Sequence, residues 1–194
     1  MNHGTFSGEP VTRWLTEPDN DRRMQLLELF RFQDPAGKFW DAPAGSTVDG
    51  ASIPRPLWTL VGSPYTGDYR RASVVHDVAC ARAGTDRSRR RAADRMFYHA
   101  CRAGDCGVRQ AILLYLGVRI GAVWPSVPQW ASALQVAESG PRLSRSAAED
   151  RMEADFRRAG EMVLAGGEDD DIEEIERRVD GALTALTAVD VRQL

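Results

Sequence analysis

Three residues have the types and the spacing for acid–base or metal chemistry: His76, Asp77 and Asp94. If Asp94 accepts a hydrogen bond from one imidazole nitrogen of His76, it fixes the tautomer and leaves the other nitrogen free to take a proton from water. The sequence therefore predicts that His76 and Asp94 are catalytic and act together as a general base.

A cation site is predicted next to this pair. Asp77 points about 100 degrees away from His76 on a helix, so its carboxylate is free to bind a hard cation. The loop of small residues and prolines at 48–54 is the expected partner, with Asp49 and Gly50 as further metal ligands and Ser52 and Pro54 shaping the loop. A cation there would polarise an ester or phosphoryl oxygen, which indicates metal-assisted hydrolysis.

Two antiparallel helices are expected to position these residues. Apolar residues recur at helical spacing from 68 to Gly84, and a second helix is expected from the capping pair Thr85-Asp86 to about 103. His76 and Asp94 lie symmetrically about the turn near 85, so they should meet. Further helices are expected at 108–123, 146–164 and 171–189, and a β-hairpin at 24–40 around the turn 34–37.

Other interpretations of the histidine stay open. A histidine on an inward helix face is commonly a hydrogen-bonded core residue. His76 and Cys80 also have the i, i+4 spacing of two zinc ligands on one helix, with His99 or Cys101 as a ligand from the second helix. Cys80 as a nucleophile activated by His76 is a further alternative. The odd, sparse set of three cysteines favours a reducing compartment.

The 194 residues, 43% hydrophobic and 27% charged, predict a mainly α (α+β) protein with a small N-terminal β-hairpin, a long loop, a three-helix core and a helical C-terminal extension. We expect an N-terminal segment at 1–22, a core domain at 23–138 and an acidic extension at 139–194. Residues 141–194 hold 8 basic against 14 acidic residues, so they are expected to dock a protein partner.

The sequence also bears on nucleic-acid binding, membrane association and cellular location. The net charge of −3, with no aromatic residues among the arginines of 87–91, gives no reason to expect nucleic-acid binding. No transmembrane segment and no export signal are recognised. The chain is expected to be cytoplasmic as encoded, with export by a signal-independent secretion or injection system left open.

Two family resemblances follow from these motifs. The strings Val48–Pro54, Ala72–Asp77 and Ala93–Phe97 resemble the bacterial and phage family called domain of unknown function 1353, over roughly residues 24–124. More distantly, the His-Asp pair on one helix and the Asp on an antiparallel helix resemble the phospholipase A2 superfamily. That likeness implies His76 as the base, Asp94 as its partner and Asp77 as a Ca²⁺ ligand, with a lipid or ester substrate. The glycine-rich calcium loop and the disulfides of that superfamily are missing.

The sequence thus favours a metal-dependent hydrolase, phospholipase-like and associated with phages or other mobile elements as an effector. A non-catalytic binding or accessory module of a phage or secretion assembly is the alternative. A toxin held in check by a partner would combine the two.

Overall fold

The computed structural model describes residues 2–16, 23–50, 53–63, 67–123 and 147–190. The chain forms two compact units, the first made of Met1–Ser52 with Gly62–Gly107 and the second of Ile53–Val61 with Val108–Leu194. Helices dominate and are accompanied by short antiparallel strands. The predicted mainly α class with β elements is confirmed.

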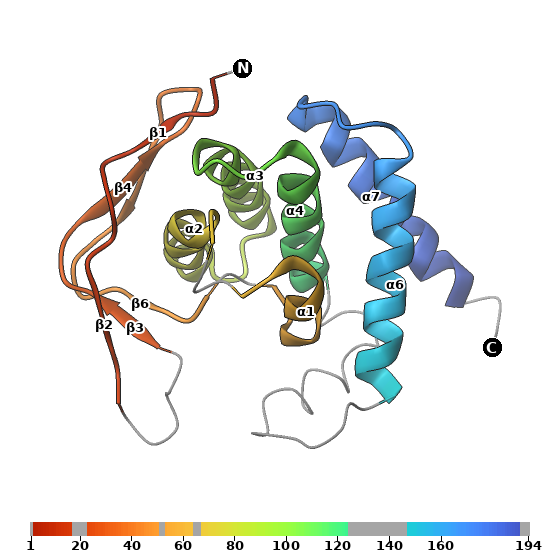
Figure 1. Cartoon of the computed structure of the whole chain (residues 1–194), viewed down its shortest axis with the longest axis horizontal. Coiled ribbons are helices and arrows are strands. Elements are labelled where there is room, and N and C mark those ends of the chain that lie inside the picture. Colours follow the sequence, from red (N-terminus) through yellow and green to blue (C-terminus); the bar gives the residue numbers. More distant parts are fainter. Residues whose placement is uncertain (1, 17–22, 51–52, 64–66, 124–146, 191–194) are drawn as a thin grey trace. The chain divides into compact units, whose positions relative to one another are not determined.

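The first unit contains two three-stranded antiparallel sheets (Figure 1). One has the order β1-β4-β5, formed by Thr5–Phe6, Phe30–Gln33 and Phe39–Ala42. The other has the order β2-β3-β6, formed by Thr12–Trp14, Met24–Leu26 and Thr47–Val48. The strands β4 and β5 form a hairpin around the predicted turn, but residues 24–26, which the prediction placed in its first arm, form β3 of the other sheet. Strands β1 and β2 come from residues expected only as an N-terminal segment, and two or three residues are too few to show alternation.

The hairpin turn is organised by Asp34. Its carboxylate accepts hydrogen bonds from the backbone N–H groups of Ala36 and Lys38, both at 3.0 Å, and from the indole Nε1 of Trp40 at 2.8 Å. Gly37 has a φ of 83°, which glycine adopts without strain. The turn therefore fixes the register of β5 and holds the Trp40 ring.

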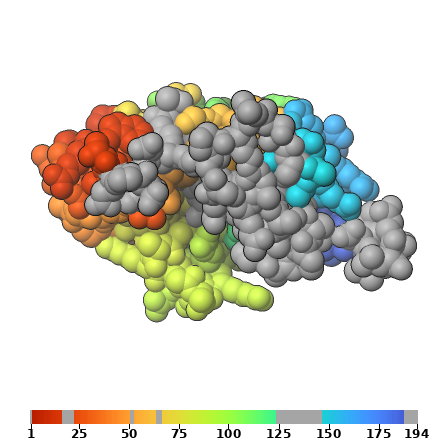
Figure 2. Space-filling model, turned by 90° about the horizontal axis from the view of Figure 1, so that it is seen from below, coloured from red at the N-terminus to blue at the C-terminus, as the bar shows by residue number. Residues whose placement is uncertain are grey.

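Helices α2 (Arg70–Ala83) and α3 (Arg87–Ala103) form the helical part of the first unit. Gly84 ends α2 with a φ of 53°, and the Asp86 side chain caps α3 by accepting from the N–H groups of Ser88 and Arg89. Helix α2 packs against α3 and against β5. In Figure 2 the yellow-green turn between the two helices projects beside the orange strands.

The second unit contains the short helices η1 (Arg55–Leu57) and α1 (Trp58–Val61) and the longer α4 (Val108–Val123), α6 (Ala147–Leu164) and α7 (Ile172–Asp190). Buried residues occur around α4, against which α6 and α7 pack. The Tyr115 hydroxyl of α4 donates to Glu176 of α7 at 3.3 Å. None of the helices that the structure describes has the length and apolarity to cross a membrane.

Among the described residues, the bounds of the five long helices agree with the sequence prediction. The helices expected in the C-terminal extension lie in the same compact unit as α4, the third helix of the expected core. The predicted boundary at 139 and the predicted helix break at 124–128 lie outside the described residues.

Candidate functional site

The structure brings His76 of α2 and Asp94 of α3 together. His76 Nε2 lies 2.9 Å from Asp94 Oδ1, and both side chains are fully buried. The Phe97 ring lies against the imidazole, with 4.7 Å between ring centroids. The imidazole is therefore held between the helices, with Nε2 as the nitrogen that contacts the carboxylate.

Cys80 lies one turn after His76 and joins this contact. Its Sγ is 3.3 Å from His76 Nε2 and 3.8 Å from Nδ1. The imidazole, the thiol and the Asp94 carboxylate thus place one donor atom each within 4.8 Å of one another. We call His76, Cys80 and Asp94 the buried cluster. Sequence reasoning recognised the His76–Cys80 spacing but looked to His99 or Cys101 for the ligand from the second helix.

His99 and Cys101 have other neighbours. His99 Nδ1 lies 3.3 Å from Nδ1 of His3, and Cys101 is a buried free thiol beside Cys106. Burial, followed by the contact with Cys106, raises the pKa of the Cys101 thiol well above its usual value. Neither residue is part of the buried cluster.

The surroundings of His76 favour its protonated form. Burial, the largest influence, lowers its pKa, but the electrostatic interaction with Cys80 and the hydrogen bonds to Asp94 and Cys80 outweigh it and raise the pKa to about 10. In its protonated form the ring balances the charge of the Asp94 carboxylate, whose Oδ1 lies 2.9 Å from Nε2. A metal cation bound between His76, Cys80 and Asp94 could replace the proton of the imidazole.

Asp77 is held by the loop rather than by the buried cluster. Its Oδ2 accepts hydrogen bonds from the backbone N–H groups of Asp49 at 3.1 Å and Gly50 at 2.8 Å. Burial, then the nearby charge of Asp49, raises the pKa of Asp77 to about 7, against the opposing effects of His76 and the two N–H donors. The prediction assumed that this loop offers carbonyl oxygens to a calcium ion, whereas at Asp77 it presents amide donors.

The remaining predicted residues have different positions. Ser52 lies outside the described residues, and Pro54 belongs to the second unit, where it precedes η1. Two surface cavities of the first unit are lined by residues other than the buried cluster and Asp77. The catalytic and calcium-binding roles of the predicted residues stay predictions.

With this geometry, the chain can be compared with known proteins. Residues 24–118 match the family described as protein of unknown function (DUF1353). The resemblance to DUF1353 is confirmed. The DUF1353 segment contains β3 to β6, helices α2 and α3, and the whole buried cluster. The distant likeness to the phospholipase A2 superfamily finds no support in the matches.

Two curated relatives of the DUF1353 segment come from Sinorhizobium fredii. The uncharacterized protein y4jT is 38% identical over 117 residues, which are 59% of this chain and 33% of that protein. The uncharacterized protein y4iH is 34% identical over 119 residues, which are 60% of this chain and 46% of that protein. The match therefore covers less than half the length of each relative. No solved structure matches the chain.

Proposed function

We propose that α2 and α3 bind a zinc-class cation through His76, Cys80 and Asp94, and that the DUF1353 segment uses this centre for hydrolysis. The observation that supports the proposal is the approach of one nitrogen, one sulfur and one oxygen donor to within 4.8 Å of one another. The three donors come from two neighbouring helices, His76 and Cys80 from α2 and Asp94 from α3.

The donor set favours zinc over calcium. Zinc accepts imidazole nitrogen, thiolate and carboxylate, whereas calcium requires six or more oxygen ligands. Zinc–ligand bonds of about 2.0–2.3 Å place neighbouring donors of a tetrahedral site about 3.3–3.8 Å apart. His76 Nε2 lies 2.9 Å from the Asp94 oxygen and 3.3 Å from the Cys80 sulfur. An opening of the His76–Asp94 contact, with the three donors drawn in from their present spread of up to 4.8 Å, would therefore admit the ion.

The described residues supply three ligands, a number that suits a catalytic site better than a closed structural one. A tetrahedral ion held by three residues keeps one position for water, and such an ion lowers the pKa of that water to about 7. His76 would then act as a ligand through Nε2, instead of as the general base predicted from the sequence. An ester or lipid substrate, Ca²⁺ at Asp77 and an effector role remain hypotheses that rest on the sequence.

Metal content and hydrolysis, measured on the same variants, test this proposal. We expect the full chain, purified from zinc-supplemented medium, to hold one equivalent of zinc by mass spectrometry and to hydrolyse at least one substrate of an ester and phospholipid panel. Cys80→Ala should lose both properties. Cys106→Ala is the matched control, because Cys106 is also fully buried but lies outside the cluster, and it should keep both.

Each other outcome has a definite meaning. Zinc bound without hydrolysis of any substrate would refute the enzymatic part and leave a metal-binding module. Hydrolysis by metal-free protein that is lost in His76→Ala would overturn the metal centre in favour of His76 as a general base. Equal zinc content in Cys80→Ala and Cys106→Ala would remove the cluster as the site.

A non-catalytic binding module is the second candidate, because the His76 and Asp94 side chains are 0% exposed and Cys80 is 5% exposed. In that case the cluster would join α2 to α3 while another surface binds the partner, and the acidic C-terminal helices are the expected contact. Asp94→Asn would then lower the melting temperature, and the metal-free protein would lack hydrolytic activity.

A further inference from the structure

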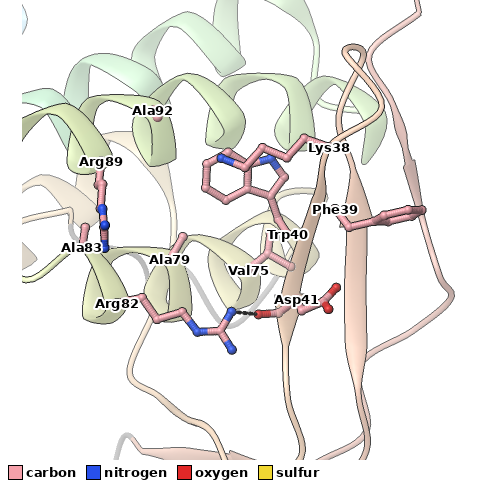
Figure 3. Close-up of a pocket in the computed structure, with 10 residues that line it drawn as sticks. All are labelled: Lys38, Phe39, Trp40, Asp41, Val75, Ala79, Arg82, Ala83, Arg89 and Ala92. Atoms are coloured by element: carbon pink, nitrogen blue, oxygen red, sulfur yellow. Dashed lines mark hydrogen bonds between the residues drawn. The ribbon is translucent and has the colours of Figure 1, made fainter.

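A surface cavity of about 300 Å³ lies where β5 meets α2 and α3 in the first unit. This volume is at the lower end of the range of small-molecule sites. Figure 3 shows its lining residues, which come from all three elements and from the turn before β5. His76, Cys80 and Asp94 do not line it, so this cavity is separate from the buried cluster.

The floor of the cavity is apolar and made of small side chains. Val75, Ala79 and Ala83 follow one another along one face of α2, and Ala92 adds the matching position of α3. The Trp40 ring stands beside them, held by its hydrogen bond to Asp34. Small side chains next to a fixed aromatic ring leave room for the hydrocarbon or aromatic part of a ligand.

Three cationic side chains surround this floor. Lys38 places its ammonium 3.6 Å from the centroid of the Trp40 ring, a partner without formal charge. Arg82 donates from Nη1 to the backbone carbonyl of Asp41 at 2.8 Å, as the dashed line in Figure 3 marks. Arg89 lies across the cavity from Trp40, and its contact with Asp86 is an exposed ion pair of 3.3 Å.

The acidic residue of the lining is already neutralised. Asp41 accepts two hydrogen bonds from Arg31, at 2.6 and 3.1 Å, and this contact holds the pKa of its carboxyl below the usual value. Asp41 therefore cancels the charge of Arg31, which does not line the cavity. Lys38, Arg82 and Arg89 face the cavity, and Arg89 also keeps its exposed ion pair with Asp86.

From this arrangement we propose that the cavity binds a small organic phosphate, with its phosphoryl group between Lys38, Arg82 and Arg89 and its apolar part on the α2–α3 floor. Three cations match a phosphate monoester, with a charge of about −1.5 to −2, better than a carboxylate. Guanidinium groups bind phosphate oxygens through paired N–H donors. The apolar floor distinguishes an organic phosphate from inorganic phosphate.

Calorimetric titration of the full chain with phenyl phosphate tests this site, with benzoate and inorganic phosphate as comparisons. We expect saturable binding of phenyl phosphate that weakens as salt rises, and at least about tenfold weaker binding of the other two anions. A second experiment compares vesicles of anionic and zwitterionic phospholipid. If the protein prefers the anionic vesicles and does not bind phenyl phosphate, the phosphate that it recognises belongs to a lipid headgroup.

Two variants and one control locate the binding. Arg82→Gln should weaken it about tenfold through loss of a charge-assisted contact. Ala79→Leu should abolish it by filling the floor without changing the charge. Arg87→Ala removes an exposed arginine that does not line the cavity and should bind like the wild type. Binding that Ala79→Leu leaves unchanged, or tighter binding of benzoate than of phenyl phosphate, would overturn the proposal. Absence of binding in every arm would overturn it as well.

Discussion

Tyr69 is a polar side chain that the first unit both buries and holds by a hydrogen bond. It is 2% exposed, and its hydroxyl donates to the backbone carbonyl of Gly62 at 2.6 Å. Burial, followed by the nearby Cys101 and Cys106, raises the pKa of this phenol well above its usual value. The folded protein therefore binds the phenolic proton more tightly than the unfolded chain does.

This difference predicts a pH dependence of stability. The stabilisation from Tyr69 is fully present below the unfolded tyrosine pKa of about 10 and is lost as pH rises above it. Tyr69→Phe should lose about 1 kcal/mol at pH 7, where the hydrogen bond is missing. It should also show a smaller loss of stability than the wild type between neutral and strongly alkaline pH. Urea unfolding at several pH values measures both, and parallel pH profiles for the two proteins would contradict the assignment.

The residues of the candidate site could be predicted in part. Symmetry about the α2–α3 turn is a local property of two helices, so the approach of His76 to Asp94 follows from spacing alone. The amide donors that face Asp77, and the approach of Arg82 and Arg89 to the cavity beside Trp40, depend on the orientation of loops and strands far away in sequence. No short sequence motif indicates that orientation.

At the scale of elements, long helices were predictable and short strands were not. The 14 residues of α2 and the 17 of α3 repeat their apolar pattern over several turns, and Gly84 and Asp86 mark the ends. Strands β1 and β6 have two residues each, so their existence depends on pairing with partners elsewhere in the chain.

The end of α3 offers a matched pair of glycine variants. A Cβ on Gly104 would lie 2.6 Å from the carbonyl oxygen of Asp68, whereas a Cβ on Gly107 would meet nothing within 4 Å. Gly104→Ala should therefore lose about 1–3 kcal/mol of stability, because backbone must shift to relieve the clash. Gly107→Ala should be neutral or stabilising by up to about 1 kcal/mol. Thermal denaturation compares them, and equal melting temperatures would refute the close approach at Gly104.

At the scale of the whole molecule, the C-terminal helices are part of a core. The sequence showed one apolar stripe on each of α6 and α7. It did not show which surface the stripes pack against, because an amphipathic pattern does not identify its packing partner. Within the second unit, a Cβ on Gly160 of α6 would lie 3.1 Å from Leu113 of α4, and α7 contacts α4 through Glu176. Helices α6 and α7 therefore both pack against α4 within the second unit.

Two substitutions in α6 test this packing. Phe156 is 3% exposed and Met162 is 44% exposed on the same helix. Phe156→Asp should cost about 3–5 kcal/mol and expose apolar surface, because it creates a cavity and buries a charge. Met162→Asp should change stability by about 0.5 kcal/mol or less. Denaturant unfolding and dye binding measure the effects, and tolerance of Phe156→Asp would show that α6 does not bury this face.

The pairing of β1 and β2 with the strands that follow bears on how this family is delimited and expressed. The match to DUF1353 begins at residue 24, the first residue of β3, and ends at 118, inside α4. A fragment cut at those borders would leave one edge of β3 and one of β4 without their partner strands, and open edges invite pairing between chains. A fragment of a relative should therefore begin upstream of the matched segment, far enough to include both strands. It should end downstream of the matched segment, beyond the end of α4.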